Sequence, residues 1–215
     1  MARSVVIATR SEGKIRELIP ILAARGFAVD TVAALGIPEA PDEAHIEQFD
    51  SFEANALAKA RYFAALLPNA VIVADDSGLV VDALGGRPGV ASKRWSNRPH
   101  LSGDALDDAN NAHLLQQLTA VGATTVSSRS ARYVCAMACC IQQADTREVV
   151  ARGSCEGHIL ASPRGSSGFG YDPLFFSTEL GLSFGDATRE EKALVSHRAR
   201  ALSALLDLLE RSHGG

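Results

Sequence analysis

Residues 71–78 read Val71-Ile72-Val73-Ala74-Asp75-Asp76-Ser77-Gly78. The four apolar residues predict a buried strand. The polar group after them predicts a functional site at the strand's carboxyl end, where open α/β sheets bind ligands. Because adjacent strand residues point to opposite faces and like charges repel, we expect Asp75 and Asp76 to have different roles. An ordinary turn is the alternative explanation, since turns prefer Asp, Ser and Gly.

Length, composition and charge narrow the class of protein. The 215 residues suit a single domain, 1–215, built as one body or two lobes. No apolar run approaches the roughly 20 residues of a membrane span, and no signal peptide is recognisable at the first residues, so we expect a cytoplasmic protein without membrane contact. The formal net charge of −4 argues against a nucleic-acid partner, because duplex binding usually relies on a basic surface.

The cysteines form no C-x-x-C pair and lie in apolar surroundings. We therefore expect reduced thiols in the core, with disulfides or a zinc site as the alternatives. The residues concerned are Cys135, Cys139, Cys140 and Cys155.

The N-terminal segment has the pattern of a phosphate site. A predicted strand over 4–8 is followed by the loop Thr9-Arg10-Ser11-Glu12-Gly13-Lys14 and, from Ile15, by apolar residues at helical spacing. A helix N-terminus offers free N–H groups, and Lys14 adds a positive charge. The loop is not a Walker A motif, since Ala8 occupies its first glycine position. An ordinary connection with a solvated lysine is the alternative.

The remaining pattern predicts a mixed α/β fold. A short connection near 144–146 implies an antiparallel hairpin, so the sheet is expected to be mixed rather than all parallel. The expected strands are 27–32, 129–142 and 148–160, the expected helices are 52–67 (capped by Ser51) and 104–118, and Glu47 lies at the end of a surface connection over 36–48.

A second polar group follows at Gly168-Phe169-Gly170-Tyr171-Asp172. Glycines let backbone approach a ligand closely, Phe169 is suited to stacking on a base, and Asp172 to accepting from a ring N–H. The alternative is a loop that packs Phe169 into the core.

The C-terminal segment has two helix-start signals. Thr188 and Glu191 have capping-box spacing, which places Lys192 in a first helical turn. A second start at Ser196 would place His197 and Arg198 at a helix N-terminus, where positive charge opposes the helix dipole. That placement suggests a ligand or partner, unless one helix runs unbroken from Arg189.

In this order the motifs resemble the inosine triphosphate pyrophosphatase family, noncanonical purine nucleotide pyrophosphatases also described as dITP/XTP pyrophosphatases. The resemblance covers nearly the whole chain, and its motifs are weak singly but specific together. They are Ala8-Thr9-x-x-x-Gly13-Lys14, Phe52-x-x-Asn55-Ala56, Ala74-Asp75-Asp76-Ser77-Gly78-Leu79, Leu84-Gly85-Gly86-x-Pro88-Gly89, Gly168-Phe169-Gly170-Tyr171-Asp172-Pro173 and Thr188-x-Glu190-Glu191-Lys192-x-x-x-Ser196-His197-Arg198.

The resemblance implies an α/β protein with a long twisted mixed sheet flanked by helices, two lobes with a nucleotide cleft between them, and a homodimer. It also implies hydrolysis of ITP, dITP and XTP to the monophosphate and pyrophosphate, by Mg²⁺-assisted attack of water on the α-phosphorus. By this analogy Asp76 is the catalytic base and a metal ligand, and Glu47 is a second metal ligand. The implied substrate-binding residues are Thr9, Arg10, Ser11, Glu12, Gly13, Lys14, Ser77 and Lys192 for the phosphates, with Lys59 as a weaker candidate, and Phe169, Gly170, Tyr171, Asp172, His197 and Arg198 for the purine.

Ser11 departs from the family pattern, in which most relatives carry asparagine. The shorter side chain leaves open a module that binds nucleotides without turnover. A second alternative is a pyrophosphatase for other modified nucleotides, which would share the phosphate-binding residues and differ only in the base pocket.

Overall fold

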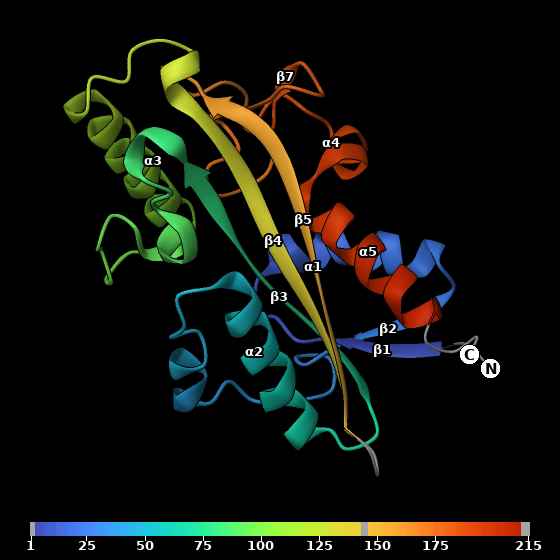
Figure 1. The fold of residues 1–215 in the computed structure, drawn as a ribbon. Helices are drawn as coiled ribbons and strands as arrows, with labels where there is room; N and C mark the ends of the chain where they lie inside the picture. Colours follow the sequence, from blue (N-terminus) through green and yellow to red (C-terminus); the bar gives the residue numbers. More distant parts are fainter. Residues whose placement is uncertain (1–2, 143–145, 212–215) are drawn as a thin grey trace. The chain divides into compact units, whose positions relative to one another are not determined.

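The computed structural model describes residues 3–142 and 146–211, and these contain a seven-stranded sheet in the order β2-β1-β3-β4-β5-β6-β7 (Figure 1). The strands are β1 (Arg3–Ile7), β2 (Phe27–Thr31), β3 (Val71–Val81), β4 (Ser130–Ile141), β5 (Arg147–Ile159), β6 (Phe175–Ser177) and β7 (Leu182–Ser183). β1 pairs in parallel with β2 and β3, whereas β6 pairs antiparallel with β5 and β7. The predicted mixed sheet is confirmed, while the predicted hairpin turn falls partly on 143–145, outside the described residues.

The helices match the predicted periodic segments within a few residues. They are α1 (Glu12–Ala24), α2 (Phe52–Leu66), α3 (Gly103–Ala120), α4 (Arg189–Val195) and α5 (His197–Arg211), with short 3₁₀ segments at Pro41–His45, Asp82–Leu84, Gly89–Arg94 and Ser127–Arg129. α1 begins at Glu12 rather than near Ile15, so Gly13 and Lys14 belong to its first turn. None of the helices in the described ranges has the length and apolar character to cross a membrane.

The predicted end of the central strand is wrong. β3 does not stop at Ala74 but continues through Asp75 and Asp76 to Val81, and so the acidic pair is not a turn. The strand continues because Leu79 and Val81 bury apolar side chains beyond the polar residues. Its pairing with β1 nevertheless ends at Ile7↔Val73.

The chain divides into two compact units. Within the described residues, the first unit contains the chain up to Asp76, residues 135–153 and the chain from Arg198. The second unit contains residues 77–134 and 154–197.

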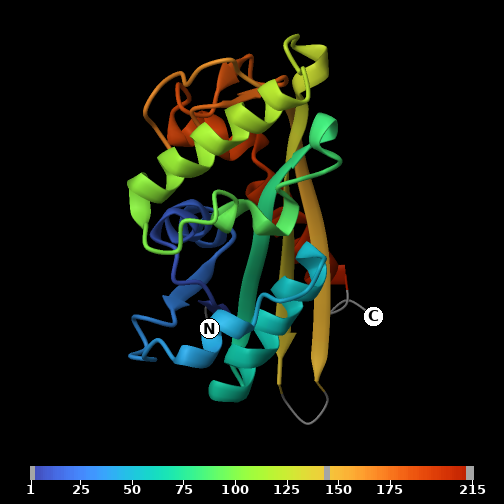
Figure 2. The ribbon, with the colours of Figure 1, turned by 90° about the vertical axis from the view of Figure 1, so that its left-hand side faces the viewer.

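Apolar residues from β1, β3 and β4 form the core of the first unit together with α1 and α5. Leu18 and Leu22 of α1 and Leu202 and Leu205 of α5 are fully buried there. α2 lies on the other face of the strands from α5 (Figure 2) and buries Phe63. Helices therefore cover both faces of this part of the sheet.

In the second unit, α3 packs on apolar residues of β3, β4 and β5. Leu114 and Leu118 of α3 join Leu79 and Phe175 in one buried cluster. The prediction of reduced core thiols is confirmed in both units, because all four cysteines are buried and free.

Candidate active site

The strand order of the first unit reverses at β1. α1 leads from β1 to β2 on one side, and the chain then returns through α2 to β3 on the other side. Since β1 ends at Ile7 and β3 runs on, Asp75 and Asp76 lie beyond the carboxyl end of β1. Ligands bind at such reversal points in open α/β sheets. The Thr9–Lys14 segment leaves β1 at the same place.

Asp75 is a buried carboxylate that two cations neutralise. Its Oδ2 atom lies 3.1 Å from Nζ of Lys14 and 3.2 Å from Nε of Arg198. Arg198 also forms a short ion pair with Glu17 on α1. Burial alone would raise the pKa of Asp75, but the charges of Lys14 and Arg198 outweigh it and hold the pKa well below its usual value. Asp75 is therefore ionised, and it fixes the position of Lys14.

Asp76 has a different environment, as predicted from its opposite orientation on the strand. Its side chain is buried, and Nδ2 of Asn55 donates a 2.9 Å hydrogen bond to its Oδ2. Burial raises the pKa of Asp76 to about 6, and the negative charge of Glu47 adds to the shift although Lys14 opposes it. A carboxyl group with this pKa can exchange a proton near neutral pH.

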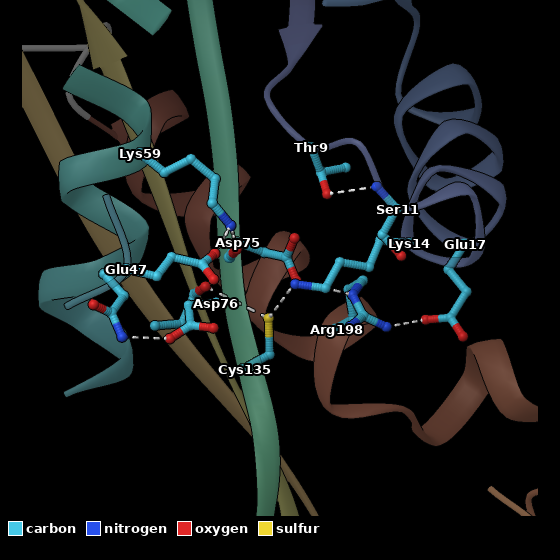
Figure 3. Close-up of polar contacts among 12 residues, drawn as sticks. Thr9, Ser11, Lys14, Glu17, Glu47, Lys59, Asp75, Asp76, Cys135 and Arg198 are labelled. Atoms are coloured by element: carbon cyan, nitrogen blue, oxygen red, sulfur yellow. Dashed lines mark hydrogen bonds and ion pairs between the residues drawn. The ribbon is translucent and has the colours of Figure 1, made fainter. Parts of the chain in front are cut away.

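Glu47 and Lys59 complete the charged group around Asp76 (Figure 3). Lys59 forms a short ion pair with Glu47 and donates a 2.9 Å hydrogen bond to the backbone oxygen of Asp75. Burial disfavours the ionised form of Glu47, yet the charge of Lys59 prevails and lowers its pKa. The structure thus brings together Lys14, Glu47, Lys59 and Asp76, which come from distant parts of the sequence.

The loop between β1 and α1 is held by its own polar groups. The Thr9 hydroxyl accepts a 3.2 Å hydrogen bond from the backbone N–H of Ser11. The Arg10 guanidinium binds both carboxylate oxygens of Glu43, at 3.1 and 2.7 Å, and the carbonyls of Ile37 and Pro38. Arg10 therefore fastens this loop to the 36–48 connection.

In the second unit, Asp172 organises the glycine-rich loop. Its Oδ2 accepts hydrogen bonds from Nζ of Lys192 at 2.5 Å and from the backbone N–H of Phe169 at 2.9 Å. Nζ of Lys192 lies 5.1 Å from the centre of the Phe169 ring. Gly168 has φ +81°, and a Cβ there would lie 2.0 Å from Asp172 Oδ2. The glycine is thus required for the approach of Asp172, not only for that of a ligand.

Two residues of α3 hold the other side of this loop. The backbone N–H of Gly170 donates to Oδ2 of Asp107 at 2.6 Å, and Nδ2 of Asn111 donates to the Gly170 carbonyl at 3.0 Å. Tyr171 is buried, and its hydroxyl donates to the Ser92 carbonyl at 2.8 Å. These contacts fix the backbone on both sides of Phe169.

The second helix start is confirmed, because Ser196 has extended dihedral angles and separates α4 from α5. His197 is buried in the second unit and stacks on Tyr133, with ring centres 4.6 Å apart. The charge of Arg198 at the helix N-terminus is balanced by Asp75 and Glu17. The predicted purine set is therefore divided: Arg198 belongs to the first unit, and Asp172 and His197 belong to the second.

Sequence reasoning missed several residues that position the site. Asn55 is part of the Phe52-x-x-Asn55-Ala56 motif, but no function was predicted for it. The only signal for a function was that Asn55 lies one helical turn from both Ser51 and Lys59. Glu17, Asp107, Asn111 and Tyr133 gave no local signal, because each acts through a contact between distant segments. Ser77, predicted as a phosphate ligand, is half-buried on β3 directly after Asp76.

In the described ranges, no group of three His, Cys, Asp or Glu side chains is arranged to hold a metal ion. Glu47 and Asp76 supply two carboxylates. A magnesium ion typically uses only one or two protein carboxylates and completes its coordination with water and substrate phosphates.

The open mixed sheet, the loop at a helix N-terminus and the paired carboxylates at the strand reversal define an α/β protein with a candidate ligand site at the strand reversal. A family model described as the Ham1 family matches residues 5–208, and the chain belongs to this family.

Two relatives align with almost the whole chain. A dITP/XTP pyrophosphatase of Nitratidesulfovibrio vulgaris is 47% identical over 207 residues, which are 95% of each chain. A dITP/XTP pyrophosphatase of Geobacillus kaustophilus is 43% identical over 213 residues, 99% of this chain and 97% of the relative. The structure of a HAM1 protein from Coxiella burnetii superposes with a TM-score of 0.80 at 29% identity, covering 97% of this chain and 99% of that protein.

Proposed function

We propose that the protein hydrolyses the noncanonical purine nucleotides ITP, dITP and XTP to the nucleoside monophosphate and pyrophosphate. The observation that carries this proposal is the partly buried charged group in which Glu47 and Asp76 lie beside Lys14 and Lys59. Carboxylates next to cations suit phosphate anhydrides, because the cations neutralise the phosphate oxygens while a carboxylate accepts a proton. The names of the relatives support the substrate class.

The donor set fits a divalent cation such as Mg²⁺. The negative charges of Glu47 and Asp76 repel each other, and burial also disfavours ionisation of Asp76. A cation between these carboxylates would relieve both effects, and hard oxygen ligands are those that Mg²⁺ prefers. When bound, the ion would polarise the phosphate oxygens and help to orient water.

The chain's own residues perform the proton transfer and the charge neutralisation. Asp76 accepts a proton from water while the water oxygen bonds to the α-phosphorus. The bond from that phosphorus to the bridging oxygen breaks, and pyrophosphate leaves with the electron pair. Lys14, Lys59 and the N–H groups of Thr9–Gly13 bind the phosphate oxygens, as helix N-termini do in other phosphate sites. Ser77 and Lys192 provide further donors.

The purine is assigned to the glycine-rich loop. Phe169 stacks on the base, and its backbone is already fixed through Asp107, Asn111 and Asp172. We assign recognition of the base edge to Asp172 and His197, while Arg198 holds Asp75 and Glu17. Inosine and xanthosine carry an oxygen acceptor at position 6 where adenosine carries an amino donor, so a protein donor there disfavours adenosine.

We also assign the protein to the cytoplasm as a homodimer, the state that the family resemblance implies. Light scattering after size-exclusion chromatography tests the dimer, since one chain has a mass of 22.7 kDa. A measured mass equal to that of a single chain at micromolar protein concentration would reject the dimer.

A pyrophosphate-release assay tests the proposed function. The protein is incubated with ITP, dITP, XTP, GTP and ATP at equal concentration with Mg²⁺, and pyrophosphate and orthophosphate are measured separately. We expect pyrophosphate from ITP, dITP and XTP in large excess over ATP, and none without a divalent cation. Orthophosphate alone would reject the chemistry. Tight binding without turnover would identify a sensing module. Turnover of other modified nucleotides, but not of ITP, dITP and XTP, would identify a pyrophosphatase with a different substrate class.

A further inference from the structure

Asn55 on α2 is a buried side chain that joins two segments of the first unit. It is 1% exposed. Its Oδ1 accepts a 2.9 Å hydrogen bond from the backbone N–H of Phe49, and its Nδ2 donates to the Phe49 carbonyl at 3.2 Å. The same Nδ2 donates to Oδ2 of Asp76 at 2.9 Å. These partners also fix the orientation of the amide, because the Phe49 N–H needs an acceptor and the carboxylate needs a donor.

The position of Asn55 follows from the start of α2. The Ser51 hydroxyl caps the helix by accepting from the backbone N–H of Ala54 at 3.2 Å. Asn55 and Lys59 are one helical turn apart and therefore share a face. Lys59 pairs with Glu47, and Asn55 holds the backbone of Phe49, two residues further along. One face of α2 thus contacts both the segment that carries Glu47 and the strand that carries Asp76.

We propose that Asn55 is a positioning residue, which sets the spacing and orientation of Glu47 and Asp76 for a divalent cation. This inference rests on the proposed function, in which these two carboxylates hold the ion. A carboxylate with one oxygen held by an N–H group keeps its remaining lone pairs in a fixed direction. The clamp on Phe49 acts at the same time on the backbone next to Glu47.

A purely structural role predicts a different result from a positioning role. In the structural case, loss of the amide lowers stability and leaves cation binding and turnover of the folded protein unchanged. In the positioning case, the cation affinity falls even in folded protein. Ser51→Ala is the matched control, because it removes the N-cap of the same helix without touching Asp76.

The experiment compares Asn55→Ser, Asn55→Leu and Ser51→Ala with the wild-type protein. Asn55→Leu keeps roughly the volume of the side chain and adds no charge next to Asp76, so it remains informative if Asn55→Ser does not fold. Mn²⁺ binding without nucleotide is measured by electron paramagnetic resonance of the free ion, and kcat and KM for ITP are measured separately.

We expect the Mn²⁺ affinity and kcat of both Asn55 variants to fall about 10–100-fold, while KM changes less than about threefold. Ser51→Ala should lower the melting temperature and leave Mn²⁺ affinity and kcat within about twofold of wild type. Mn²⁺ affinity and kcat within about twofold of wild type in a cooperatively melting Asn55 variant would overturn the inference. Failure of the proposed function is distinguishable, since it is seen as absence of pyrophosphate with the wild-type protein.

Discussion

Nζ of Lys14 lies 3.1 Å from Oδ2 of Asp75, the same oxygen that Arg198 Nε approaches at 3.2 Å. One buried carboxylate on β3 therefore orders a cation from α1 and a cation from α5. Asp76, the next residue, faces Asn55 and the charge of Glu47 instead. The two adjacent acids thus have different surroundings: Asp75 neutralises two cations, whereas burial raises the pKa of Asp76.

Asp75→Asn should destabilise the protein strongly, because it leaves Lys14 and Arg198 without their buried counter-charge. Removing one partner of a buried ion pair costs about 3–5 kcal/mol in the free energy of unfolding. Urea unfolding at pH 7 measures this change in the free energy of unfolding. Asp207→Asn is the control, since Asp207 pairs with Arg25 in an exposed contact of 3.5 Å, and such pairs contribute at most about 1 kcal/mol. A loss for Asp75→Asn no larger than that of the control would contradict the prediction.

The features that could be predicted from the sequence are those with a local pattern. The helical spacing after Lys14 and the capping box at Thr188 both depend on residues a few positions apart, and both elements are confirmed. The predicted end of β3 is wrong. Asp, Ser and Gly favour a turn when they are considered in isolation, whereas burial of Leu79 and Val81 extends the strand.

Contacts between distant segments could not be predicted. The unfavourable charge of Arg198 at a helix start indicated a partner, but Asp75 is 123 residues away and Glu17 is 181 residues away. The role of Asn55 likewise depends on the 3.2 and 2.9 Å contacts that its amide makes with Phe49 and Asp76. Side-chain spacing on a single element can show that residues share a face, but it does not identify such distant partners.

The stability of the metal-free protein should depend on pH through Asp76. Its pKa in the folded state is about 6, above the ordinary value of 3.8, so the folded state binds this proton more tightly than the unfolded state. The resulting stabilisation is fully present below about pH 4 and is lost as the pH rises through 6, up to roughly 3 kcal/mol.

Asp76→Asn removes this dependence. In EDTA, the stability of the variant relative to wild type should increase between pH 4 and pH 8, although the variant should lose most pyrophosphate release. Denaturant unfolding at several pH values measures the difference. A stability difference that stays constant across this range would show that Asp76 titrates normally.

Arg10→Ala should loosen the 36–48 connection, because the Arg10 guanidinium binds Glu43 and two backbone carbonyls there. We expect faster hydrogen exchange in this connection and a loss of about 1.5–3 kcal/mol in the free energy of unfolding, the contribution of hydrogen bonds to a charged group. Arg61→Ala is the control, because Arg61 makes a similar two-pronged pair with Glu148 at an exposed position. Equal exchange rates in the two variants would refute the fastening role of Arg10.

Phe169→Ala should weaken recognition of the base without affecting recognition of the phosphates. Stacking of a base on an aromatic ring is worth about 1–3 kcal/mol, so KM for ITP should rise roughly 5–150-fold, while Phe169→Tyr should stay near wild type. Inorganic tripolyphosphate, which has no base, serves as a competitive inhibitor in the same assay. Its inhibition constant should not change, because the phosphate contacts are assigned to other residues. A parallel rise of the inhibition constant would mean that the substitution disturbs Lys192 and Asp172, which contact Phe169, rather than stacking alone.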